Sequence, residues 1–227
     1  MKKITYILLL LIPLIIYADP IKIEDFLGKF HASYPNITSL KINFIQTKHS
    51  PMFLEPIQAG GTFYYQISDN DVPLLRWEYS PPYEGWGLIR ENNYYSYTKI
   101  LNQMEVYSFE QYRHYQELLG ALDFSEEKLE NLLEERYNLV ITKTDKEYRL
   151  DIFSEDDSPA FEKIQLYFQK DSLKPLRLEY YEGDDDYVRF RFQDMQVNPQ
   201  LADNLFEVIV PDGTTIITEK EIERMLH

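Results

Sequence analysis

The chain has 227 residues, of which 44% are hydrophobic and 27% charged, and such a composition supports a folded domain with a buried core. Asp and Glu number 38 against 23 Lys and Arg, a formal net charge of −15, which argues against a nucleic-acid binder or general attraction to anionic lipid. The sequence contains no cysteine, which excludes disulfides, thiolate metal sites and cysteine nucleophiles.

The first residues have the pattern of an export signal. A basic start, Met1-Lys2-Lys3, precedes an almost wholly apolar stretch over 4–17. That stretch is about fourteen residues long, whereas a spanning helix needs roughly twenty. We therefore predict a signal peptide over 1–18, cleaved after Ala18, and an exported domain over 19–227. The alternative is an uncleaved anchor.

Three short amphipathic helices are predicted. The first covers 21–34 and ends at Pro35; its apolar face consists of Ile23, Phe26, Leu27, Phe30 and Tyr34. The second covers 110–119 and ends at Gly120. The third lies within 123–135 and carries Leu129, Leu132 and Leu133 on one side.

The rest of the chain alternates apolar and polar residues with a period of two, which is typical of half-buried strands. Leu40, Ile42 and Phe44, for example, are separated by Lys41 and Asn43. The pattern returns at 63–67, 75–79, 94–98, 104–106, 139–143, 148–153, 161–169, 175–181 and 186–192. Turn residues separate these runs, and no linker divides the chain. The prediction is a mainly β (α+β) domain with a single curved antiparallel sheet of about eleven strands.

A sheet of that width curls, and its apolar concave face must be covered. Three short helices can cap a half-barrel but can hardly fill it, so the geometry favours a cavity beneath a helical lid. The alternative is a dry core in which the inward side chains interdigitate. The pattern alone leaves both open.

Residues with catalytic or metal-binding chemistry show no recognisable spacing. His31, His49, His114 and His227 are scattered, and the acidic runs 155–157 and 182–186 lack the spacing of a calcium loop and are predicted to be solvated turns. No glycine-flanked nucleophilic serine or phosphate-binding glycine loop occurs. We predict no metal, no cofactor and no enzymatic activity. A carboxylate pair of the glycosidase type stays open, because such a pair forms in space and not in sequence.

The order of these features resembles the LolA family of periplasmic lipoprotein carriers. The stretch 40–46 is similar to the family's Phe-x-Gln strand, and it is followed by Gly61-Thr62-Phe63. The segment 74–79, with Pro82 after it, is similar to the Arg-Trp-Glu strand and its proline. The closing family pattern matches Asn198-Pro199, Leu201, Asp203, Leu205-Phe206 and Pro211-Asp212-Gly213. The resemblance covers essentially the whole exported chain.

The resemblance implies an open half-barrel with a helical lid that shelters the acyl chains of lipoproteins and moves them from the inner to the outer membrane. It further implies a periplasmic monomer without a cofactor. The implied partners are acylated lipoproteins, an inner-membrane ABC-type lipoprotein-releasing complex and an outer-membrane lipoprotein acceptor. Two other functions stay open: a periplasmic sensor of lipids or lipoproteins with a similar half-barrel, and the carboxylate hydrolase.

The expected cavity wall consists of the inward apolar residues of the strands. Its predicted members are Phe44, Phe63, Tyr65, Leu75, Trp77, Tyr79, Leu88, Leu166, Phe168, Leu178, Phe190 and Phe192. The lid is predicted on the apolar faces of 21–34 and 110–135, through Phe26, Phe30, Leu118, Leu129 and Leu133. The competing interpretation is ordinary core packing without cargo.

Two departures from the family pattern concern the lid and a hairpin. The family often carries Lys-Arg-Pro before the Trp strand, with an Arg that helps to hold the lid shut, whereas this chain has Asp71-Val72-Pro73. Arg76 and Arg90 are the candidates to replace that arginine. In the next hairpin, Glu91-Asn92-Asn93 stands in place of Asp-Gly-Lys.

Overall fold

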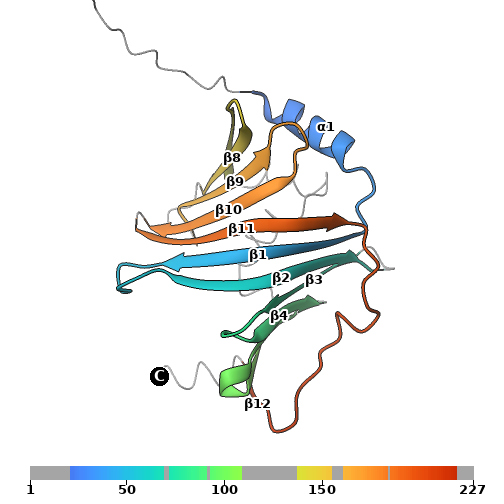
Figure 1. Cartoon of the computed structure of the whole chain (residues 1–227), viewed down its shortest axis with the longest axis vertical. Coiled ribbons are helices and arrows are strands. Elements are labelled where there is room, and N and C mark those ends of the chain that lie inside the picture. Colours follow the sequence, from blue (N-terminus) through green and yellow to red (C-terminus); the bar gives the residue numbers. More distant parts are fainter. Residues whose placement is uncertain are drawn as a thin grey trace, which may run out of the picture.

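The chain folds around one wide, curved sheet (Figure 1). The computed structural model describes residues 21–68, 72–90, 93–108, 137–154, 161–183 and 185–218. Within these ranges lie one α-helix, one 3₁₀ turn and twelve strands. They are α1 (Ile23–Ser33), β1 (Ser39–His49), β2 (Ile57–Ile67), β3 (Pro73–Tyr79), β4 (Gly85–Arg90), β5 (Asn93–Thr98), η1 (Lys99–Leu101), β6 (Gln103–Ser108), β7 (Tyr137–Lys143), β8 (Glu147–Ser154), β9 (Lys163–Gln169), β10 (Pro175–Gly183), β11 (Asp186–Val197) and β12 (Thr215–Thr218).

The strand order is β12-β6-β5-β4-β3-β2-β1-β11-β10-β9-β8-β7. The predicted single curved sheet in a mainly β domain is therefore confirmed. One strand differs from the expectation. β12 pairs in parallel with β6, Ile216 opposite Met104, whereas every other neighbouring pair is antiparallel. The predicted signal peptide and the predicted helices over 110–119 and 123–135 lie outside the described residues.

The register separates the sheet into an apolar inner face and a polar outer face. Phe44 of β1 stands opposite Phe192 of β11 and Gly61 of β2, which places these three residues on the inner face. Lys41 stands opposite Gln196 and Tyr64 on the outer face. Successive residues of a strand point to opposite faces, so the alternation in the sequence becomes this separation.

Helix α1 packs on the inner face at the β8–β10 side of the sheet (Figure 1). The Phe26 ring lies 5.5 Å from that of Tyr148 and 5.1 Å from that of Phe168, measured between ring centroids. Phe26 and Phe30 are 1% and 2% exposed. This first cluster also contains Leu27, Ile141, Leu150, Ile152, Phe161, Ile164, Leu166, Leu173, Leu178 and Tyr180.

A second cluster runs across β1 to β5 on the same face. Its buried members are Leu40, Tyr65, Leu75, Ile89 and Tyr94, which stand opposite one another from strand to strand. Aromatic rings lie flat along it: Trp77 stacks on Tyr94 at 5.7 Å, and Tyr94 stacks on Tyr107 at 5.9 Å. The two clusters thus occupy separate parts of the inner face.

Two carboxylates are buried on the outer face, within a network of arginines and tyrosines. Glu179, 5% exposed, accepts hydrogen bonds from Arg189 Nε at 2.8 Å, Arg177 Nε at 3.2 Å and the Tyr181 hydroxyl at 2.6 Å. Asp151 accepts one from Arg149 Nε at 2.8 Å. Each buried charge therefore has an opposite charge beside it, as a stable fold requires.

The network predicts a change of stability at alkaline pH. Burial and the hydrogen bond to Glu179 raise the pKa of Tyr181 to about 12 from its ordinary value of 10.0. The folded state therefore holds this proton more tightly than the unfolded state, and the resulting stability is present below pH 10 and is lost as the pH rises towards 12. Tyr181→Phe should lose less stability than the native chain between pH 9 and pH 11.5, measured by urea unfolding. Tyr83→Phe, at an exposed tyrosine, is the matched control, and equal losses for native chain and Tyr181→Phe would contradict the prediction.

Candidate functional site

A cavity of about 560 Å³ lies on the inner face, between the two packed clusters. Its size falls within the range of about 300–1,000 Å³ that is usual for ligand pockets. The centre of its wall comes from β1, β2 and β11, the strands between the region covered by α1 and the region of stacked rings. Its apolar described wall contains Leu40, Ile42, Phe44, Ile57, Ala59, Phe63, Trp77, Tyr79, Tyr94, Pro175, Leu178, Tyr180, Val188, Phe190 and Phe192.

The charged side chains of the wall occur at one end. Along β1 the inward residues are Leu40, Ile42, Phe44, Gln46 and Lys48, so the surface changes from apolar to polar toward the β1–β2 turn. Lys48 is exposed there. This end of the cavity is its mouth, because wall residues near the turns are open to water.

Acidic and aromatic groups also lie at the mouth. Glu84 and Glu182 belong to the wall, and Glu84 forms an ion pair with Lys99. Tyr83 is 52% exposed and also lines the cavity. The site therefore has an apolar interior and a rim of mixed charge, an arrangement that suits a molecule with a long apolar part and a polar end.

Seven of the twelve predicted wall residues lie in this cavity. They are Phe44, Phe63, Trp77, Tyr79, Leu178, Phe190 and Phe192. All seven point inward from neighbouring strands, as the two-residue alternation predicts. Contact of these side chains with a lipid stays a prediction.

The other five predicted residues lie elsewhere. Tyr65 and Leu75 are buried in the second cluster, and Leu166 and Phe168 are buried in the first, beside α1. Leu88 is on the outer face, because it stands opposite Arg76 and not opposite Trp77. The placement of Leu88 in the wall is thus corrected by the register of β3 and β4.

Several wall residues were not among the predicted ones. The additional inward residues include Leu40, Ile42, Gln46, Lys48, Ala59, Tyr180 and Val188. Each lies two or four residues from a predicted member of the same strand, so extending the alternation would have found them. Tyr83 and Glu84 lie in the β3–β4 turn, where no periodic signal exists.

Two glycines let aromatic side chains lie close to the sheet. A Cβ at Gly61 would overlap the Phe44 ring and the carbonyl oxygen of Glu78. A Cβ at Gly87 would overlap the indole of Trp77, which lies over β4 and stacks on Tyr94. Only glycine gives the rings this space, and the flat Trp77 leaves room in front of it for the cavity.

The predicted lid residues can be located only in part. Phe26 and Phe30 are packed against the sheet beneath α1, and the described cavity wall contains no residue of that helix. Their contacts are those of helix-to-sheet packing. Leu118, Leu129 and Leu133 lie outside the described residues.

Neither candidate for a replacement latch faces the cavity. Arg76 lies on the outer face, where its Nε donates to Glu78 at 2.9 Å and its guanidinium lies 4.8 Å from the centroid of the Trp86 ring. Arg90 lies two residues after Leu88 on β4 and therefore points to the same outer face. Its Nη1 donates to the Phe206 carbonyl at 3.2 Å. Both arginines thus make contacts on the outer face: Arg76 within β3 and with Trp86 of β4, and Arg90 with the segment that contains Phe206.

The described part of the chain has no group of three His, Asp or Glu side chains placed to hold a metal ion. Over the same ranges, no helix combines the length and apolar content required to cross a bilayer. The buried carboxylates Asp151 and Glu179 lie on the face opposite the cavity.

A twelve-stranded open half-barrel with a hollow apolar inner face defines the class of protein to which this chain belongs. The family model described as outer membrane lipoprotein carrier protein LolA matches residues 35–209. The chain is thus a member of the LolA family. No curated protein matches its sequence.

Solved structures share the fold at low sequence identity. An uncharacterized conserved protein from Thermus thermophilus is 11% identical, with a TM-score of 0.50 over 86% of this chain and 98% of that chain. MucB is also 11% identical, with a TM-score of 0.50 over 82% of this chain and 62% of its own. A putative outer membrane lipoprotein-sorting protein domain from Vibrio parahaemolyticus is 11% identical, with a TM-score of 0.45 over 80% and 95%. These likenesses bear on the fold alone.

The close approach of Trp77 to β4 can be tested with a single methyl group. Gly87→Ala should push the indole out of its stack on Tyr94 and lower the free energy of unfolding by about 1–3 kcal/mol, the usual cost of overpacking. Near-ultraviolet circular dichroism and urea unfolding report the two effects. Gly28→Ala is the matched control, since a Cβ at this helical position meets nothing within 4 Å and should be neutral or stabilising. Equal behaviour of the two variants would refute the packing argument.

Proposed function

We propose that this protein is a periplasmic carrier that shelters the acyl chains of lipoproteins and moves them from the inner to the outer membrane. The observation that carries the proposal is the apolar cavity of about 560 Å³ in a member of the LolA family. Each methylene kept from water contributes about 0.8 kcal/mol, or on the order of 10 kcal/mol for a chain of sixteen carbons. A free acyl chain in an aqueous compartment needs such a shelter.

The chemistry of the wall fits cargo that is held by contact area. Polar side chains occur at the mouth, at Gln46, Lys48, Glu84 and Glu182, while the deeper wall is formed by residues such as Ile42, Phe44 and Phe190. A wall of this kind binds different chains with similar strength, because apolar contact is not directional. It also leaves the polar part of a lipoprotein outside.

In this proposal the protein is exported by a signal peptide over 1–18 and acts as a monomeric binding protein without a cofactor. An inner-membrane ABC-type complex delivers the lipoprotein, and an outer-membrane acceptor receives it. The predicted lid over 110–135, through Leu118, Leu129 and Leu133, would close over the chains, while Phe26 and Phe30 anchor α1 to the sheet beside the cavity. Family membership and the shape of the inner face support these assignments.

A second candidate, a lipid-sensing regulator, draws support from the likeness to MucB, whose structure in complex with MucA is known. The fold is common to both candidates and does not separate them. Handover of cargo from one membrane to another distinguishes a carrier from a regulator. The regulator would instead form a stable complex with a membrane signalling protein.

Filling the cavity tests the carrier proposal. Ala59 lines the wall, whereas its neighbour Gln58 is exposed on the outer face of the same strand. Ala59→Trp should weaken binding of a tripalmitoylated cysteine lipopeptide by at least about tenfold, equivalent to 1.4 kcal/mol, because the indole occupies the space of the chain. Gln58→Trp is the matched control and should bind as the native chain does.

Binding is measured by retention of the radiolabelled lipopeptide, with the unacylated peptide beside it, and circular dichroism verifies that both variants fold. Equal retention of the acylated and unacylated peptides would defeat the proposal. So would a folded Ala59→Trp variant with native affinity.

A further inference from the structure

Three turns at the mouth of the cavity expose large apolar side chains. Met52 and Leu54, in the β1–β2 turn, are 87% and 105% exposed, and Ile100 in η1 is 88% exposed. Leu101 and Tyr83 are the other exposed apolar residues of these turns. We call Met52, Leu54, Tyr83, Ile100 and Leu101 the apolar tips.

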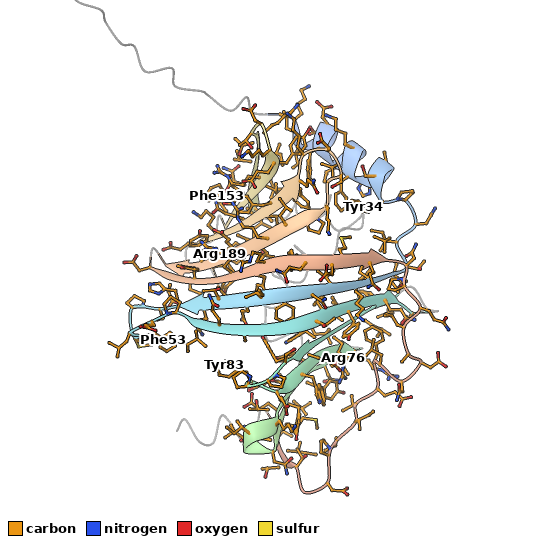
Figure 2. All side chains as sticks on the ribbon, viewed as in Figure 1. Tyr34, Phe53, Arg76, Tyr83, Phe153 and Arg189 are labelled. Atoms are coloured by element: carbon orange, nitrogen blue, oxygen red, sulfur yellow. The ribbon has the colours of Figure 1, made fainter. Side chains whose placement is uncertain are left out.

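The topology brings the apolar tips to one end of the molecule. Because neighbouring strands are antiparallel, β1, β3 and β5 run in the same direction. The β1–β2, β3–β4 and β5–β6 connections, which follow them, therefore lie at the same end of the sheet. Figure 2 shows Phe53 of the first turn and Tyr83 of the second at this end. The tips thus lie at one end of the sheet although they are far apart in the sequence.

Each tip is fixed by a backbone hydrogen bond across its turn. Phe53 N donates to Ser50 O at 2.9 Å, and Tyr83 N donates to Ser80 O at 3.2 Å. In the third turn, Asn102 N donates to Lys99 O at 3.0 Å. These bonds close the three turns that carry the exposed apolar side chains.

The apolar tips are continuous with the cavity. Ile57, which follows the β1–β2 turn, is 40% exposed and lines the cavity. Tyr83, in the β3–β4 turn, is 52% exposed and also lines it. Lys48 and Glu182, on β1 and β10, also line the cavity at this end of the strands. A surface that covered the tips would therefore also cover the mouth.

We propose that the apolar tips insert into the headgroup region of a lipid bilayer and hold the mouth of the cavity against it. A bilayer accepts separate apolar protrusions, whereas a protein partner would have to complement three turns with polar residues between them. Tyrosine suits the boundary between headgroups and hydrocarbon. With a net charge of −15, the contact depends on apolar insertion and not on attraction to anionic lipid. The inference rests on the proposed carrier function and adds the surface at which cargo enters and leaves.

Flotation with phosphatidylcholine vesicles tests the docking. The double variant Met52→Ser with Leu54→Ser should bind these vesicles at least tenfold more weakly than the native chain. The matched control is Ile209→Ser with Val210→Ser, since these residues are 55% and 40% exposed but lie in the segment between β11 and β12. This control should bind as the native chain does. Failure of the native chain to float, or equal effects of the two double variants, would overturn the proposal.

Fluorescence can locate the first tip in the bilayer. Leu54→Trp should gain emission that brominated phosphatidylcholine quenches, whereas the added emission of Ile209→Trp should be unaffected. Quenching of both or of neither would count against docking through the tips.

Lipopeptide binding without vesicles separates this inference from the carrier proposal. Met52 and Leu54 do not line the cavity, so their variant should retain the tripalmitoylated lipopeptide as the native chain does. Loss of flotation with lipopeptide binding intact supports docking by the tips. Native flotation of the tip variant overturns docking, even if Ala59→Trp abolishes lipopeptide binding as the carrier proposal expects. Binding of the native chain to a detergent-solubilised membrane protein but not to vesicles also overturns it in favour of a protein partner.

Discussion

The strict alternation of side chains across a wide, curved sheet is the constraint on which the structure depends. Strand twist curls a sheet of this width, so the inward side chains enclose a volume that they must fill or leave open. Phe26 and Phe30 fill it on one side through α1, and the stacked rings of Trp77, Tyr94 and Tyr107 fill it on the other. The strands between these regions have no such cover among the described residues, and the cavity lies there.

The charged network of the outer face disfavours any other register of the strands. A register slip of one residue would turn the inward residues of a strand outward and its outward residues inward. On β10, such a slip would move Glu179 away from Arg189 and Arg177 into the apolar interior, while Leu178 would face water. Because an unpaired buried carboxylate is strongly unfavourable, the charged network specifies the register as well as covering the outer face.

The alternation predicted which face most side chains occupy, but not how far along the sheet the cavity extends. Leu166 and Phe168 point inward as predicted and yet lie beneath α1, because the position of the helix is set by contacts distant in sequence. The strand 85–90 shows a different difficulty. Its inward positions are Gly85, Gly87 and Ile89, and two of these are glycines. Its large residues Trp86 and Leu88 face outward, so the pattern points to the wrong face.

Long-range pairing explains the remaining differences from the prediction. β12 is four residues long and pairs in parallel with β6 after an irregular segment from residue 198 onward, which no local pattern indicates. The sequence near 198 does carry a signal whose role the fold explains. The Asn198 side chain accepts from the Thr38 and Ser39 amides at 2.8 and 3.2 Å and donates to Asn36 O at 3.0 Å, which joins the end of β11 to the start of β1. Asn198, a residue of the family's closing motif, thus joins the ends of the two central strands β1 and β11 away from the mouth.

The direction of the polarity gradient along β1 limits how a cargo can lie. From Leu40 to Lys48 the inward residues cover about 26 Å at roughly 3.3 Å per residue, and the polar members come last, beside the turns. An acyl chain that lay the other way would place its polar end at the level of Leu40, far from the charged side chains at the mouth. In the proposed carrier, an acyl chain would therefore enter with its apolar end first and leave its polar end at the mouth. Under that proposal, loading and release would use the same opening, and a membrane or acceptor that exchanged cargo would stand at that end of the sheet.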